Sequence, residues 1–152
     1  MDVAIVVTAL LAGAHAAAMA VVFTAPREYV APSFICGFAA RLVRDSLLVA
    51  GTGSAWATFL AATMAVLVAV MVTPKRVVPP VVLVAAVVQL AASVAVFNVF
   101  VEMLRAPSLE GPALAESAAR LNNSLGRAFT AFVAIALGLQ LGVILTRRKR
   151  RE

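Results

Sequence analysis

Apolar residues run along the chain in blocks, and short polar segments separate the blocks. Each block is about 20 residues long, the length that a helix needs to cross about 30 Å of hydrocarbon. The polar face that a soluble amphipathic helix shows is missing from these blocks. The pattern predicts an all-α, polytopic transmembrane helical bundle that forms a single integral membrane domain over residues 1–152. The predicted spans are 3–23, 30–50, 55–73, 81–104 and 124–146, followed by a basic tail over 147–152.

The breaks between spans contain residues that end helices. Pro26 breaks the chain after the first span, and residues 51–54 (Gly-Thr-Gly-Ser) form a short turn after the second. Prolines at 74, 79 and 80 follow the third span, and a loop over 105–112 follows the fourth. We expect a helix to restart near Ala113, polar at first and apolar over 128–146. A four-span alternative makes the second segment re-entrant or interfacial.

The basic residues indicate the orientation of the chain. Cytoplasmic segments of membrane proteins carry an excess of Lys and Arg. With the basic tail in the cytoplasm, five spans also place the 75–76 and Arg27 loops there, and they place the loop over 105–127 outside. We therefore expect a protein integral to the cytoplasmic (plasma) membrane, with a cytoplasmic C-terminus and the lipid bilayer as its surroundings.

Composition agrees with this class. The chain is 63% hydrophobic and only 13% charged, whereas soluble domains carry about 25% charged residues. Basic residues of the tail supply a large part of the formal net charge of +6, and in that position they indicate the orientation of the chain in the membrane. No nucleic-acid-binding module is visible, so nucleic acid is not an expected partner.

Three charges interrupt the second predicted span. Arg41 and Asp45 are four residues apart, so they share a helical face and could pair. Arg44 adds an excess positive charge. Ionisable groups at membrane depth are costly and usually mark an ion pair, a relay or a substrate path. Two interpretations remain: a structural ion pair with Arg44 extending toward the interface, or an anion-attracting site that lines a path.

Other polar residues in the spans can likewise be interpreted as structural or as functional groups. Gln89 and Ser93 share a face of the fourth segment, and Asn98 follows. Hydrogen bonds between helices are the default role of such groups, and lining a polar cavity is the functional alternative. His15 in the first span is interpreted as a packing group, because a metal site needs further ligands.

Small residues indicate close helix packing. Gly138 and Gly142 are four apart, and alanines at 57, 61, 65 and 69 form a second stripe with that spacing. Such stripes let helix backbones approach each other in lipid. We count Gly37, Gly138 and Gly142 as packing residues, in a compact bundle or a homo-oligomer.

Nothing in the sequence predicts an enzyme. We see no nucleophile with a base, no pair of carboxylates on one face and no phosphate-binding glycine loop. The single cysteine, Cys36, lies in an apolar context and cannot form a disulfide within the chain. We expect no catalytic residues, no metal and no cofactor.

One run carries a family likeness. Residues 21–62, VVFTAPREYVAPSFICGFAARLVRDSLLVAGTGSAWATFLAA, resemble the threonine/serine exporter family, and most closely the small membrane subunit of its split, two-protein form. The likeness extends to the C-terminal span with its basic end at 148–150. The matching positions are Phe23, Pro26, Gly37, Arg44, Gly51, Trp56, Thr58 and Phe59.

The resemblance implies a membrane subunit of a secondary transporter that exports small amino acids such as threonine and serine. It also implies a larger partner subunit, and some split systems are linked to dicarboxylate export. Arg44 would attract the carboxylate of the small polar metabolite, and Arg41 and Asp45 would hold Arg44 in place. Gln89, Ser93 and Asn98 would line the cavity. The alternative is a structural or assembly subunit without a substrate site.

The chain departs from the family in the fourth span. The family's Pro-Gly break is absent from Val81 to Asn98, which contains neither residue type. Broken helices often form transporter sites, because the freed backbone groups bind substrate. Either the side chains of Gln89 and Ser93 replace that backbone polarity, or the site is altered.

Overall fold

The computed structural model describes residues 3–73, 80–88, 90 and 93–148, and every regular element among them is a helix. The all-α prediction is therefore confirmed. The elements are α1 (Val3–Val22), η1 (Arg27–Tyr29), α2 (Val30–Val49), α3 (Ser54–Val72), α4 (Pro80–Val87), α5 (Ser93–Arg105), η2 (Ala106–Ser108) and α6 (Gly111–Arg148).

Helices α1 and α2 form a pair joined by the break that the sequence predicts. Pro26 precedes η1, and the chain turns back there to begin α2. The two helices approach closely at Gly13, where an added Cβ would lie 3.0 Å from the Phe34 ring and from its carbonyl oxygen. Gly37 is buried on α2 beside Cys36 and Ala40. Small residues therefore set the short distance between these helices.

Helices α3 and α6 cross where α6 carries its glycines. A Cβ on Gly138 would meet the Phe59 carbonyl oxygen and the Ala62 Cβ, and a Cβ on Gly142 would meet Val66. Residue numbers rise together on both helices, so α3 and α6 run parallel. The alanine stripe of α3 is fully buried at all four positions, 57, 61, 65 and 69, as a packing face requires.

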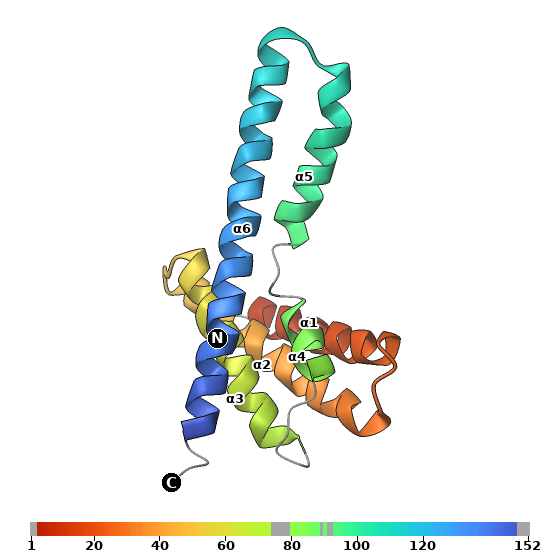
Figure 1. The fold of residues 1–152 in the computed structure, drawn as a ribbon, viewed down its shortest axis with the longest axis vertical. Helices are drawn as coiled ribbons and strands as arrows, with labels where there is room; N and C mark the ends of the chain where they lie inside the picture. The colour runs from red at the N-terminus through yellow and green to blue at the C-terminus, as the bar shows by residue number, and fades with distance from the viewer. Residues whose placement is uncertain (1–2, 74–79, 89, 91–92, 149–152) are drawn as a thin grey trace.

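The fourth predicted span is two helices rather than one. Helix α4 lies in the body of the molecule, where Val82, Ala85 and Ala86 are buried. Helix α5 rises away from that body beside the first half of α6 (Figure 1). The two halves have different packing partners: α4 packs on α2 and α1, whereas α5 packs on α6. An apolar pattern shows that a segment is buried or in lipid, but it does not show against which helix each half packs.

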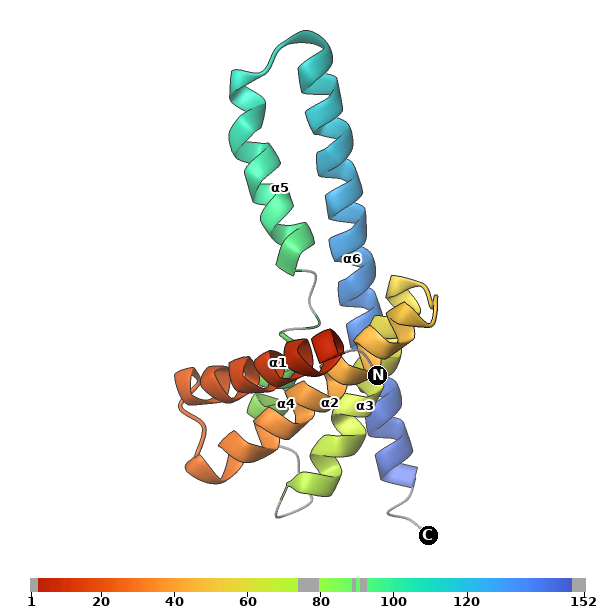
Figure 2. The ribbon, with the colours of Figure 1, turned by 180° about the vertical axis from the view of Figure 1, so that it is seen from behind.

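The last helix is longer than the predicted span. Helix α6 has 38 residues, which at 1.5 Å per residue gives a length of about 57 Å. The polar segment and the apolar segment from 128 onward are thus one continuous helix, as the restart near Ala113 predicts. The first half forms a hairpin with α5, and the second half packs on α3 (Figures 1 and 2).

Among the residues that the structure describes, three helices are long and apolar enough to cross a membrane: α1, α3 and the stretch of α6 from Gly111 to Thr146. Helix α2 has a similar length but contains the three charges. Both views show that α1 lies across the direction of α6 rather than alongside it (Figures 1 and 2). Large apolar side chains are exposed on each of the three candidate helices, including Leu11, Met71 and Phe129. Such extensive exposed apolar surface is typical of contact with lipid or with other membrane helices.

Candidate functional site

The three charges of α2 form a connected polar cluster. Arg41 Nε donates a hydrogen bond to Asp45 Oδ2 at 2.8 Å, as the spacing of four residues predicts. Their side chains are 30% and 14% exposed. This short, charge-assisted contact satisfies one carboxylate oxygen of Asp45 and holds Arg41 along its own helix.

A residue of α1 joins the cluster from the neighbouring helix. The Thr8 hydroxyl lies 3.1 Å from Asp45 Oδ2 and 2.9 Å from the Ile5 carbonyl oxygen, so one hydroxyl hydrogen serves two acceptors. Asp45 Oδ2 therefore accepts from Arg41 on α2 and from Thr8 on α1. The Asp45 carboxylate links the two helices.

Arg44 connects the cluster to α3. Its Nε donates to Thr58 Oγ1 at 3.2 Å, whereas its Nη1 is 3.9 Å from Asp45 Oδ1, beyond hydrogen-bonding distance. Among the described residues, the two terminal nitrogens of Arg44 have no hydrogen-bond acceptor. The Arg44 side chain is only 20% exposed. Four of its five N–H groups are thus available to a ligand, in a partly buried place.

The cluster has one excess positive charge, because two arginines face one carboxylate. Side chains from α1, α2 and α3 meet there, so the charge lies at a junction of three helices. A partly buried cation without a bonded counter-charge attracts an anion more strongly than it would in water. The arrangement can bind one carboxylate.

The structure brings together only part of the predicted set. Arg41, Arg44 and Asp45 lie in one cluster, whereas Gln89 lies outside the described residues. Helix α5 begins at Ser93 and carries the exposed Asn98, and it packs on α6 instead of on α2. The division of the fourth segment separates α5 from the charged cluster.

Two residues of the cluster were not singled out as site residues from sequence. Thr8 is a lone hydroxyl in an apolar helix, and such a group is expected to bond across helices. Thr58 is a position of the family likeness, but its side chain gave no sign of contact with Arg44. Residues 14 positions or more apart meet here through the packing of α2 against α3 and α1, which local spacing does not show.

A second polar cluster joins α5 to α6. Ser117 donates to Glu102 Oε2 at 2.7 Å, and both residues are buried. Arg120 lies 3.7 Å from Glu102 and 3.5 Å from Glu116. These contacts hold α5 against α6 in the hairpin. They also satisfy the buried Glu102 carboxylate, which is stable only when it is hydrogen-bonded or paired.

No group of metal-ligating side chains occurs within the part of the chain that the structure describes. Cys36 is buried in the apolar core. His15 is exposed on α1 rather than packed inside the chain, so its predicted role as a packing group would require a neighbour outside this chain.

The comparisons with known proteins gave no relatives. No protein-family model, no curated protein and no solved structure matches the chain.

Proposed function

We propose that this chain is the membrane subunit of a secondary transporter that exports small amino acids such as threonine and serine, together with a larger partner subunit. The observation that carries the proposal is the partly buried Arg44 guanidinium, whose terminal nitrogens have no hydrogen-bond acceptor among the described residues. Charged groups at membrane depth usually mark a substrate path or an ion pair. Here Asp45 is hydrogen-bonded to Arg41 and lies 3.9 Å from Arg44 without a hydrogen bond to it, so the terminal nitrogens of Arg44 keep their hydrogen-bonding capacity for a substrate.

The chemistry suits a carboxylate. Arginine presents a planar fork that matches the two oxygens of a carboxylate, and such bidentate pairs are strong and directional. One excess positive charge is matched by one carboxylate group at the cluster. A dicarboxylate, the variant of this proposal, would bring two negative charges to the same cluster. The charge count therefore favours a substrate that presents a single carboxylate there, as threonine and serine do.

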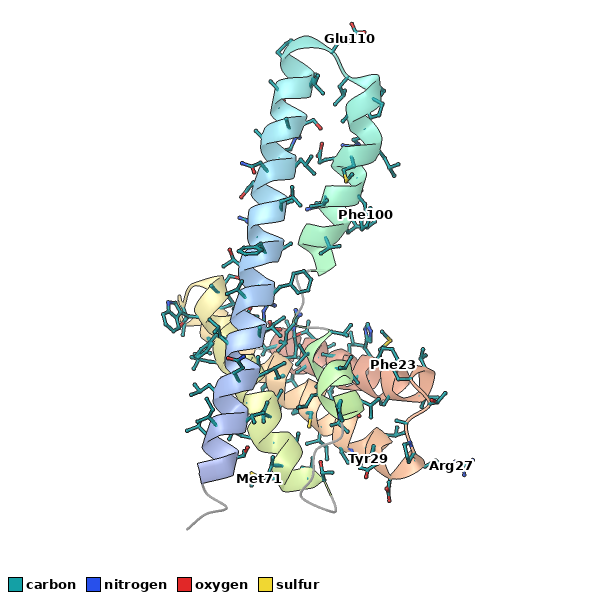
Figure 3. The ribbon with its side chains drawn as sticks, viewed as in Figure 1. Phe23, Arg27, Tyr29, Met71, Phe100 and Glu110 are labelled. Atoms are coloured by element: carbon teal, nitrogen blue, oxygen red, sulfur yellow. The ribbon has the colours of Figure 1, made fainter. Side chains whose placement is uncertain are left out.

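The direction of the helices supports the proposed orientation. Because α3 and α6 run parallel, their C-terminal ends lie at the same end of the pair. In Figure 3, Arg27 and Met71 lie toward that end, and Glu110 lies at the opposite one. Arg27 and the C-terminal ends of α3 and α6 thus lie on one side, which we assign to the cytoplasm. The 75–76 pair and residues 149–152 lie outside the described residues, and in the sequence they follow α3 and α6.

Five membrane segments are part of the same proposal. In Figures 1 and 2, α1 lies across α6, so in a five-span arrangement α1 and α2 would tilt toward α6 as one unit and keep the Arg44–Thr58 contact between α2 and α3. The larger partner subunit would stabilise that arrangement by covering their exposed apolar side chains. Trp56, exposed at the start of α3 and packed edge-on against Phe59, would mark the outer membrane interface.

Export tests the proposal directly. Cells without their own threonine exporters would express the chain with its larger partner subunit, and efflux of preloaded threonine would be measured. We expect efflux above the level of cells without the chain, and a reduced efflux with Arg44→Gln at equal membrane abundance. Efflux that is unchanged by Arg44→Gln would contradict the role of Arg44.

One observation favours the alternative, a structural subunit without a substrate site. Gly138 and Gly142 of α6 pack inside the chain against α3, which makes a rigid unit suited to assembly. This alternative expects Arg44→Gln to be harmless to transport, and Gly138→Leu to reduce the amount of the assembled complex. The two variants in the same cells distinguish the functions.

A further inference from the structure

Thr58 is a buried hydroxyl that its own helix does not use. Its side chain is 1% exposed, and Oγ1 accepts from Arg44 Nε at 3.2 Å. Thr63 and Thr73, also buried threonines, each donate to the carbonyl oxygen four residues earlier. Among the described residues, Thr58 makes no such hydrogen bond. The Thr58 side chain therefore differs from its neighbours in having Arg44 as its partner.

This contact fixes the orientation of the Arg44 guanidinium group. The guanidinium group is planar, so a hydrogen bond at Nε restrains the plane and the direction of both terminal nitrogens. Without that bond, a long arginine side chain in an apolar span extends toward the nearest polar interface. The acceptor comes from α3, a different helix from that of Arg44, so the restraint also depends on the packing of α2 against α3.

We infer that Thr58 is a positioning residue for substrate binding: it accepts the Arg44 Nε–H and thereby aims the terminal nitrogens of Arg44 at the substrate carboxylate. This inference rests on the proposed function of Arg44. Thr58 itself does not need to touch the substrate. Its effect is on binding rather than on the movement of the loaded transporter.

The first test measures transport in inverted membrane vesicles, where the cytoplasmic side faces the medium and substrate concentration is controlled. The vesicles contain the full chain with its larger partner subunit. Thr58→Val removes the hydroxyl with little change in shape, and we expect the KM for threonine to rise about tenfold, the effect of losing a hydrogen bond to a charged group. The maximal rate should change less than about twofold, and Thr58→Ser should restore the KM.

Thr63→Val is the matched control. Thr63 is also buried on α3, but it bonds to Phe59 and Gly138 carbonyl oxygens and not to the cluster. Its loss should lower abundance or stability without a change in KM. If Arg44→Gln raises the KM for threonine but Thr58→Val leaves it unchanged, the positioning role of Thr58 is wrong while the role of Arg44 still stands. Absence of threonine uptake by the wild-type chain would instead contradict the proposed function.

A second measurement does not need transport. In the detergent-purified chain labelled with ¹⁵N, the Nε–H signal of Arg44 is assigned by its loss in Arg44→Lys. We expect this hydrogen to exchange with water about tenfold faster in Thr58→Val than in the wild type or in Thr58→Ser. Equal exchange in all three proteins would overturn the contact on which the inference depends.

Discussion

At the scale of residues, Asp45 holds the charged cluster together. One of its carboxylate oxygens accepts from Arg41 and Thr8, and the other faces Arg44 at 3.9 Å. Asp45 therefore fixes Arg41 and joins α1 to α2, while it makes no hydrogen bond to Arg44, whose partner is Thr58. Because the pair is partly exposed, solvent screening reduces its strength relative to a fully buried pair.

Replacing Asp45 tests this arrangement. Asp45→Asn leaves two arginines facing each other without a counter-charge, and we expect a loss of about 1–2 kcal/mol in the free energy of unfolding. Arg41→Gln combined with Asp45→Asn should recover part of the loss, because the repulsion is relieved. Thermal unfolding in detergent measures both variants. A double variant less stable than Asp45→Asn alone would contradict the pairing.

At the scale of elements, the crossing of α3 and α6 is the tightest contact described. A Cβ on Gly138 would clash with the Phe59 carbonyl oxygen, which belongs to backbone that cannot rotate away. Thr63 adds a hydrogen bond to the Gly138 carbonyl oxygen at 3.1 Å across the crossing. Backbone contact and this hydrogen bond together fix the register of the two helices.

A pair of glycine substitutions on α6 tests the crossing. Gly138→Leu should push the helices apart and lower the melting temperature sharply, with loss of folded protein from the membrane. Gly126→Ala is the control, since a Cβ there meets nothing within 4 Å, and it should be neutral or stabilising by up to about 1 kcal/mol. Equal stability of the two variants would show that the crossing is not as close as described.

The helices α1, α2 and α3 could be predicted from sequence to within two residues, because long apolar runs end at prolines, glycines and charges. The division of the fourth segment could not. Helix α5 is held to α6 by Glu102 and Ser117, which are 15 residues apart across a hairpin. A hydropathy pattern contains no information about that pairing, so 81–104 looks like one span.

In the candidate site, too, contacts within one helix could be predicted from sequence and contacts between helices could not. The pairing of Arg41 with Asp45 follows from the helical repeat and was predictable. The contacts of Thr8 and Thr58 depend on which helices are neighbours, and so does the separation of Asn98 on α5 from the cluster.

At the scale of the whole molecule, the break between α1 and α2 and the tip of the α5–α6 hairpin lie at opposite ends (Figures 1 and 3). Arg27 and Met71 lie toward one end, and Glu110 lies at the tip of the α5–α6 hairpin (Figure 3). Under the proposed orientation the hairpin tip is outside the cell and Arg27 is in the cytoplasm.

Cysteine labelling tests that orientation. In a Cys36→Ser background, Glu110→Cys should react with a membrane-impermeant maleimide in intact cells. Arg27→Cys, equally exposed in the structure, should react only after the cells are permeabilised. Labelling of Arg27→Cys but not Glu110→Cys in intact cells would reverse the proposed topology.

The central claim is that Arg44 recognises a substrate carboxylate, and competition tests it most directly. Uptake of labelled threonine into inverted vesicles would be measured with added serine or with serinol, which lacks the carboxylate. We predict that serine inhibits at a concentration about tenfold lower than serinol, and that Arg44→Gln removes this difference. Equal inhibition by serine and serinol in the wild-type protein would contradict carboxylate recognition by Arg44.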